Sequence, residues 1–464
     1  MPRTDHRPTR IRWSYRVSSI WMLALSLLTL AAPSTAAADE QADSTVFPAS
    51  WPNWRGPRQD GSAPQANPPV EWSDTKNVEW KLEIPGEGHA TPVVWNDRIF
   101  LLTAVETDET AERPAADPEA KTVPPDRIYQ FLVMCVDRTT GRELWRRETC
   151  RSVPREGRHT TNTYASGSPV TDGHHVYAFF GSRGVYCLDL DGQIIWQQDL
   201  GEMRTRNGWG EGASPALAAG HLIVNWDAEE GSFIIALDAA TGQTRWKAER
   251  PEPTSWATPL IVEFNGRHQV IVNGTQRVRS YDLATGDVLW ECGGQTVNAI
   301  PSPVQFEDLA IAMSGYRGSA VFAIPLAAQG DVTDSPQIAW QYHDSTPYVP
   351  SPVVVGNRIY FTRGNNGILT CLNARTGELV FGPERLPAAE NIYASPVAAQ
   401  GRIYFVGRDG TTVVVADADN FKVLAVNPLN QPVDASPVLV GDQLLLRSAN
   451  HLFSIRDTAR GATP

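Results

Sequence analysis

A Ser-Pro or Thr-Pro pair occurs eight times along this chain, and each pair opens a short apolar segment. From the second pair onward, successive prolines lie 41 to 49 residues apart, and the first interval is 77 residues. Strand-like segments that repeat about every 40 to 50 residues are typical of β-propellers, in which each repeat forms one blade. The sequence therefore predicts an all-β fold, an eight-bladed β-propeller of four-stranded antiparallel blades. The pairs are Thr91-Pro92, Ser168-Pro169, Ser214-Pro215, Thr258-Pro259, Ser302-Pro303, Ser351-Pro352, Ser395-Pro396 and Ser436-Pro437.

A second signature is a glycine turn followed by a large aromatic side chain, with three residues between the glycine and the aromatic residue. The glycine permits a positive φ in a tight turn, and the aromatic ring supplies apolar area between blades. We interpret this series as structural, with Trp340 and Leu424 filling the aromatic position in two further repeats. The pairs are Gly141 and Trp145, Gly192 and Trp196, Gly242 and Trp246, Gly286 and Trp290, and Gly377 and Phe381.

The eighth repeat is one strand short. It runs from Ser436 to Ile455 and contains three strands, whereas Val78 to Ile84 forms a separate strand before the first repeat. Closing a propeller hides sheet edges that a broken ring would expose. We therefore expect the N-terminal strand 78–84 to close the last blade, and we assign residues 78–457 to the propeller.

The remaining segments are predicted from their composition. Residues 1–38 have a basic start, a short apolar run and an Ala-Ala-Ala end at Ala38, which predicts a cleaved signal peptide and an exported, periplasmic or secreted protein. An uncleaved anchor stays open as an alternative, and the absence of cysteine there argues against a lipoprotein. Residues 39–77 are expected to cap the propeller, 106–126 to form a flexible insert, and 458–464 a tail.

Charge and cysteines limit the partners. Removing residues 1–38 changes the formal net charge from −12 to −16, which argues against nucleic acid and anionic membranes as partners. Cys135, Cys187 and Cys371 recur at one position of the repeat, where other repeats have Ala or Ser, so they serve as small apolar residues. Whether Cys150 forms a disulfide stays open.

We expect the protein to be a monomer that binds a protein or peptide partner and has no membrane span after cleavage.

Candidate site residues lie where the repeats differ, in the connections between one blade and the next. These connections should meet at one mouth of the central channel, which is the default position for a binding site. The alternative is that the same residues only cap the strands. The candidates are His89, His159, Asn162, Tyr164, Arg206, Trp209, Glu211, Trp256, Tyr348, Tyr393 and Asp434.

Catalytic motifs are absent from the sequence. There is no Gly-x-Ser-x-Gly elbow, no phosphate-binding glycine loop and no His-Glu-x-x-His metal motif. The sequence therefore predicts no catalytic residue and no metal site.

Several short stretches together resemble the pyrroloquinoline-quinone-like (PQQ-like) propeller superfamily. They are the Ser-Pro-Val strand openings, the Leu-Asp-x-x-Thr-Gly turns, and the segments 51–57, 164–169, 208–210, 348–352 and 393–396. One branch of the superfamily comprises quinoprotein dehydrogenases with PQQ and calcium, whose hallmark pair of adjacent cysteines is missing here. The other is the propeller scaffold of the outer-membrane β-barrel assembly machinery, which is similar in size and blade plan but carries a lipid-anchor cysteine that this chain lacks.

The resemblance implies three functions that the sequence leaves open. The first is a non-catalytic protein-binding or peptide-binding scaffold of the cell envelope, in which strand edges or the channel mouth hold the partner. The second is a quinoprotein oxidoreductase that binds PQQ with calcium in the channel. The third is a carbohydrate or small-ligand binder in which exposed Trp and Tyr side chains stack on sugar rings. We expect the scaffold, without a cofactor.

Overall fold

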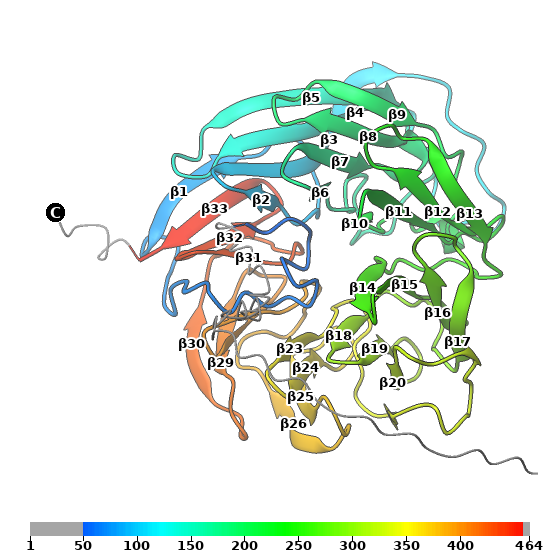
Figure 1. The fold of residues 1–464 in the computed structure, drawn as a ribbon. Coiled ribbons are helices and arrows are strands. Elements are labelled where there is room, and N and C mark those ends of the chain that lie inside the picture. The colour runs from blue at the N-terminus through cyan, green and yellow to red at the C-terminus, as the bar shows by residue number, and fades with distance from the viewer. Residues whose placement is uncertain (1–49, 458–464) are drawn as a thin grey trace, which may run out of the picture. The chain divides into compact units, whose positions relative to one another are not determined.

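The computed structural model describes residues 50–457, which belong to one compact unit. The predicted signal peptide and C-terminal tail lie outside the described residues. Eight sheets are arranged around a central axis, with the first strand of each repeat nearest the centre (Figure 1). The predicted all-β, eight-bladed propeller of four-stranded antiparallel blades is confirmed.

Each of the first four blades has four antiparallel strands in sequence order. Blade 1 comprises β2 (Val93–Trp95), β3 (Arg98–Thr110), β4 (Arg127–Asp137) and β5 (Glu143–Ser152). Blade 2 comprises β6 (Val170–Thr171), β7 (His175–Phe179), β8 (Val185–Asp189) and β9 (Ile194–Gln198). Blade 3 comprises β10 (Ala216–Ala218), β11 (His221–Trp226), β12 (Phe233–Asp238) and β13 (Thr244–Glu249). Blade 4 comprises β14 (Leu260–Phe264), β15 (Arg267–Asn273), β16 (Arg277–Asp282) and β17 (Val288–Gly293).

The next three blades repeat this order. Blade 5 comprises β18 (Val304–Phe306), β19 (Leu309–Ser314), β20 (Ala320–Pro325) and β22 (Trp340–Tyr342). Blade 6 comprises β23 (Val353–Val355), β24 (Arg358–Thr362), β25 (Ile368–Asn373) and β26 (Leu379–Arg385). Blade 7 comprises β27 (Val397–Ala399), β28 (Arg402–Val406), β29 (Thr412–Ala416) and β30 (Val423–Asn427). Two short 3₁₀ helices, η1 (Gly181–Arg183) and η2 (Arg206–Gly208), lie in connections.

Two blades contain a strand from elsewhere in the chain. Blade 8 is formed by β31 (Val438–Val440), β32 (Gln443–Arg447), β33 (His451–Arg456) and β1 (Val78–Glu83), and β1 pairs antiparallel with β33. In Figure 1, the blue β1 lies beside the red β33. Blade 4 has a fifth strand, because β21 (Gly330–Asp331) pairs in parallel with β17. A blade edge in this protein can therefore accept a further strand.

The glycine turns and the aromatic series are two halves of one contact between blades. Five tryptophans, but not Trp290, lie on the glycine turn of the following blade, where a Cβ on the glycine would come within 2.5–2.8 Å of the indole ring. Each indole nitrogen also donates to a backbone oxygen near that turn, at 2.7–3.1 Å. The pairs are Trp80 and Gly141, Trp145 and Gly192, Trp196 and Gly242, Trp246 and Gly286, and Trp340 and Gly377.

The Ser/Thr residues of the Ser-Pro and Thr-Pro pairs form a closed ring of hydrogen bonds, which we call the hydroxyl ring. Each backbone N–H donates to the side-chain hydroxyl of the equivalent residue in the next blade, at 2.9–3.2 Å. The last link runs from Ser436 to Thr91 and closes the circle. The members are Thr91, Ser168, Ser214, Thr258, Ser302, Ser351, Ser395 and Ser436.

Residues 51–63 contact several blades, and we call them the N-terminal cap. Trp51 is fully buried and exchanges backbone hydrogen bonds with Val94 of blade 1. The Arg55 guanidinium, also buried, donates to the carbonyl oxygens of Pro352 and Pro396, which precede blades 6 and 7. The cap is tied to the ring at separated points and therefore covers one end of the channel.

The insert in blade 1 begins later than expected. Residues 106–110 continue β3, so the irregular part is 111–126. This part packs against the connection between blades 2 and 3. The Lys121 backbone N–H donates to Asn207 at 2.8 Å, and the Arg204 side chain pairs with Asp117 at 3.0 Å.

The cysteines are all free within the described residues. Cys135, Cys187 and Cys371 are fully buried, each on the third strand of its blade. Cys150 forms no disulfide, which answers the question left open by the sequence.

Candidate functional site: the central cavity and the blade edges

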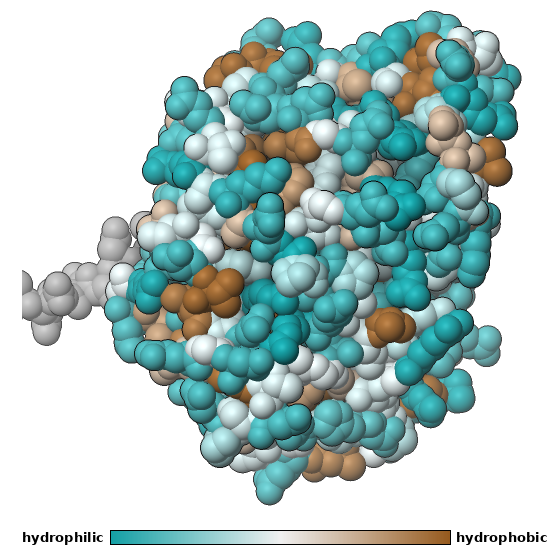
Figure 2. Space-filling model, turned by 90° about the vertical axis from the view of Figure 1, so that its right-hand side faces the viewer, coloured by the Kyte–Doolittle hydropathy of each residue, from teal (hydrophilic) through white to brown (hydrophobic). Residues whose placement is uncertain are grey.

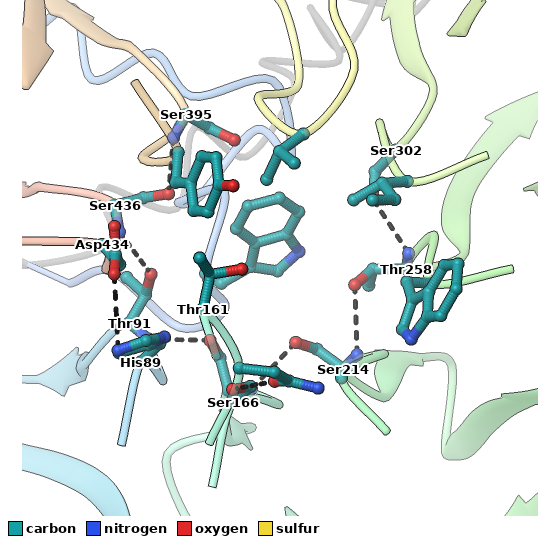
Figure 3. A pocket seen from close by; sticks show the side chains of 18 of the residues that line it. His89, Thr91, Thr161, Ser166, Ser214, Thr258, Ser302, Ser395, Asp434 and Ser436 are labelled. Carbon is teal, nitrogen blue, oxygen red and sulfur yellow. Dashed lines mark hydrogen bonds and ion pairs between the residues drawn. The ribbon is translucent and has the colours of Figure 1, made fainter. Parts of the chain in front are cut away.

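A cavity of about 370 Å³ lies in the central channel. The segments that lead into all eight blades contribute lining residues, many of which are labelled in Figure 3. Trp54 of the N-terminal cap also lines the cavity. Because the cap covers that end of the channel, the cavity is blind. Its volume lies in the range of typical ligand pockets, about 300–1,000 Å³.

The hydroxyl ring supplies seven of the lining residues, all except Ser351. Figure 3 shows members of the ring, among them Ser214, Thr258 and Ser302, around the open space. Each hydroxyl oxygen accepts one backbone N–H, and none of the eight hydroxyl protons has an acceptor within residues 50–457. The ring therefore offers the cavity both O–H donors and unused lone pairs.

Aromatic side chains form much of the cavity wall. They come from the connections that precede blades 3, 4, 6 and 7, and from blade 5 itself. Trp209 and Trp256 stack with ring centroids 6.4 Å apart, and Tyr316 and Tyr348 stack at 4.7 Å. The Trp256 indole nitrogen donates to Gly210 at 2.8 Å, which holds the two tryptophan segments together.

The described lining also contains one carboxylate. Asp434 accepts from Arg408 through both oxygens, at 2.6 and 3.0 Å, and lies 3.5 Å from the His89 Nε2 atom. Burial lowers the pKa of His89 to about 4, so this imidazole is neutral at pH 7. Arg408 also lies over the Tyr393 ring, at 4.4 Å from its centroid. The negative charge of Asp434 is therefore compensated by Arg408, which does not itself line the cavity.

Eight of the eleven residues chosen from the sequence line the cavity. They are His89, His159, Asn162, Trp209, Trp256, Tyr348, Tyr393 and Asp434. Asn162 has a supporting role, because its side-chain nitrogen donates to the backbone oxygens of Trp209 and Glu211 at 2.9 and 3.2 Å.

Tyr164, Arg206 and Glu211 do not line the cavity. The Tyr164 hydroxyl donates to Glu156, and its ring packs edge-on against Tyr129. Arg206 is the first residue of η2, three positions before Trp209. The Glu211 carboxylate points away from the channel to η1, where it accepts the backbone N–H of Ser182 at 2.7 Å and also the Ser182 hydroxyl. Enclosure raises the pKa of Glu211 to about 7.

Sequence reasoning missed several contributors to the cavity, among them Trp54, Tyr316 and the hydroxyl ring. Trp54 was assigned only to the cap, Tyr316 lies inside a blade rather than in a connection, and the hydroxyl ring was read only as a marker of strand starts. The recurrence of a hydroxyl residue before all eight prolines was the signal for the ring, since proline itself does not require one there.

The cavity does not fit PQQ with calcium. PQQ carries three carboxylates, but no Lys or Arg lines the cavity. Calcium prefers six to eight oxygen ligands, usually with several carboxylates. Asp434 is the single lining carboxylate and is paired with Arg408. Across residues 50–457, no group of three or more His, Cys, Asp or Glu side chains could hold a metal ion.

The outer strands of the blades form a second set of accessible groups. Except in blade 4, where β21 covers β17, the outermost strand has no further strand partner within the described part of the chain. β5 is the longest of these edges, at ten residues. Figure 2 shows the side of the molecule that carries β13 and β17, where hydrophobic residues form small separate groups on a largely hydrophilic surface.

The fold and the cavity define the class: a closed eight-bladed propeller with a blind, aromatic and hydroxyl-lined channel. A family model described as outer membrane protein assembly factor BamB matches residues 130–382, more than half of the chain. The chain belongs to this family. No curated protein matches it.

Solved structures share the propeller at low sequence identity. BamB from Moraxella catarrhalis is 14% identical with a TM-score of 0.52, covering 77% of this chain and 99% of its own. Quinohemoprotein alcohol dehydrogenase from Comamonas testosteroni is 11% identical with a TM-score of 0.57, covering 88% and 80%. A europium-containing methanol dehydrogenase is 10% identical with a TM-score of 0.59, covering 88% and 98%. These likenesses show the fold alone.

Proposed function

We propose that this protein is an exported, non-catalytic scaffold of the cell envelope that holds extended segments of partner proteins at its blade edges. The observation that carries the proposal is strand addition within the protein itself. β1 completes blade 8 from the far end of the sequence, and β21 adds a fifth strand to blade 4. An extended partner segment would add to an open edge in the same way, with main-chain hydrogen bonds supplying affinity.

The family description supports the kind of partner. It names an assembly factor for outer membrane proteins, and bacterial outer membrane proteins are built largely of antiparallel β-strands. Before such strands pair with one another, their backbone groups are available to an open edge. Export follows from the predicted signal peptide. Among residues 50–457, the structure contains no helix of the length and apolarity that a membrane crossing needs.

The best candidate edge is β5, with the neighbouring β9. β5 is ten residues long and exposes Leu144 at 40%, while β9 exposes Ile194 and Ile195 at 37% and 51%. A strand laid along β5 would pair with its backbone and cover Leu144. The quinoprotein alternative has no comparable support, because the cavity lacks the cations and the carboxylates that PQQ with calcium needs.

Site-directed photocrosslinking tests this proposal. A photoreactive residue at Leu144 is compared with one at Val123, which is 63% exposed but lies in the irregular part of the insert. The probe is a urea-unfolded outer-membrane β-barrel protein diluted into buffer with the mature protein. We expect crosslinks from position 144, few from position 123, and none from either position to the folded barrel. Equal yields at both positions, or no crosslinks at all, would contradict docking at β5.

A further inference from the structure

The hydroxyl ring has an unusual chemical consequence for the cavity. Its members are at most 8% exposed, yet their hydroxyl protons have no acceptor within residues 50–457. A ligand in the cavity can therefore accept hydrogen bonds from the seven ring hydroxyls that line it, and it can also donate to them, because each ring oxygen retains a lone pair. Hydroxyl groups on a ligand provide both.

The aromatic wall adds a second requirement. Trp209, Trp256, Tyr316 and Tyr348 all line the cavity, and they stack in pairs, which leaves each ring one face and its edges for a ligand. The Trp209 indole nitrogen makes no hydrogen bond within the described residues, and a ligand can therefore use it. A suitable ligand has flat C–H faces to lie on aromatic rings and polar groups around its edge. Pyranose rings have this construction.

The charges around the cavity favour a neutral ligand. No Lys or Arg lines the wall, and the only lining carboxylate, Asp434, is paired with Arg408. The charged groups nearest His89 are Asp434, Arg408, Arg447 and Arg158. Arg158 is in turn paired with Glu87. Arg447 has no carboxylate partner within residues 50–457, but it does not line the cavity, so a charged ligand would meet no unpaired charge of opposite sign on the wall itself.

The blind end argues against a threaded polypeptide. The N-terminal cap covers one end of the channel, so a ligand enters and leaves through the same mouth. From these observations we propose that the central cavity is a binding site for a neutral saccharide, stacked between the aromatic walls with its hydroxyls on the hydroxyl ring. This site is separate from the blade edges and goes beyond the scaffold function.

Intrinsic tryptophan fluorescence and calorimetry of the mature protein test the site directly. The probes are the neutral disaccharides cellobiose, maltose and chitobiose, the charged monosaccharides glucuronic acid and glucosamine, and a Gly-Tyr-Gly peptide. We expect at least one neutral disaccharide to change the fluorescence with saturation, and the charged sugars and the peptide to bind at least tenfold more weakly. No saturable change with any neutral disaccharide at millimolar concentration would overturn the proposal, as would tighter binding of the peptide or of a charged sugar.

Two matched variants in the hydroxyl ring locate the ligand. Ser214 lines the cavity and Ser351 does not, although both accept the same kind of buried N–H. Ser214→Ala and Ser351→Ala should therefore destabilise the fold alike, but only Ser214→Ala should weaken saccharide binding, by about threefold to tenfold. Equal effects on binding would place the saccharide elsewhere.

Trp209→Ala should reduce saccharide binding by tenfold or more, and Trp209→Phe should retain most of it. Neither change touches β5, so photocrosslinking at Leu144 should be unaffected. The two proposals can therefore fail independently.

Discussion

Trp196 of blade 2 lies directly on Gly242 of blade 3. A Cβ on Gly242 would come within 2.6 Å of the indole ring, and the indole nitrogen donates to the Ala239 carbonyl oxygen at 2.9 Å. Four further tryptophan–glycine pairs repeat this contact around the ring. The blades are thus joined by an apolar face, a hydrogen bond and a glycine that leaves room for both.

A pair of glycine substitutions in blade 3 separates backbone strain from this contact. Gly242 and Gly220 have nearly equal φ values, +72° and +71°, but no atom lies within 4 Å of a Cβ built at Gly220. Gly220→Ala should lower the free energy of unfolding by about 1 kcal/mol, because the alanine must adopt a left-handed backbone conformation. Gly242→Ala should lower the free energy of unfolding by about 2–4 kcal/mol, because the Trp196 indole must also move. Urea unfolding followed by circular dichroism measures both, and equal losses would contradict the contact.

The hydroxyl ring should contribute to stability at every position. Ser351→Ala leaves the backbone N–H of Ser302 buried without an acceptor, so we expect a loss of about 1–3 kcal/mol in the free energy of unfolding. Ser351→Thr keeps the hydroxyl, as Thr91 and Thr258 do in the native ring, and should cost much less. Thermal unfolding compares the two. A Thr variant as unstable as the Ala variant would mean that the hydroxyl is not the cause.

Arg55 should hold the N-terminal cap on the ring. It donates to three carbonyl oxygens, those of Asp60, Pro352 and Pro396. Burial lowers its pKa to about 10, so it remains charged at neutral pH. Arg55→Ala leaves the three acceptors unpaired, and limited proteolysis should then cut within 51–63 at least tenfold faster. Arg58→Ala, at an exposed position of the same segment, is the control. Similar cleavage rates in the two variants would contradict the role of Arg55.

Glu211 should make stability depend on pH. Enclosure raises its pKa from 4.5 to about 7, so the folded protein binds this proton more tightly than the unfolded chain. The resulting stabilisation is full below the unfolded pKa and is lost as pH rises to about 7, with a total of about 3 kcal/mol. Glu211→Gln should remove this loss. The difference in unfolding free energy between the two proteins, measured from pH 4.5 to 8, should grow in favour of the variant.

His89 also makes the free energy of unfolding depend on pH, with a slope opposite in sign to that of Glu211, but it does not obscure this measurement. Its pKa is lowered to about 4, so the unfolded chain binds that proton more tightly, and its contribution to stability is lost as pH falls from about 6.5 to 4. The effect is the same in wild type and in Glu211→Gln, and it cancels in the difference. Parallel pH curves for the two proteins would show that Glu211 titrates normally.

The candidate site could be predicted in part. Connections between blades meet at one mouth in any propeller, so eight of the chosen residues do line the cavity. The direction of an individual side chain does not follow from this rule. Glu211 lies one residue from the lining Gly212, yet its carboxylate binds Ser182 behind the wall. Trp54 reaches the cavity only because the cap is tied across the ring, which no local pattern records.

The sequence by itself determined the number of blades, their strands and the repeated positions of the turn glycines and the aromatic residues, because those features recur with the blade period. Tertiary structure alone decided what the recurring residues do. The hydroxyl ring joins residues 41 to 345 positions apart, and its unpaired protons meet only when all eight blades surround one axis. The blind end, the aromatic wall and the compensated Asp434 likewise depend on contacts between distant segments, since each requires the ring to be closed and capped.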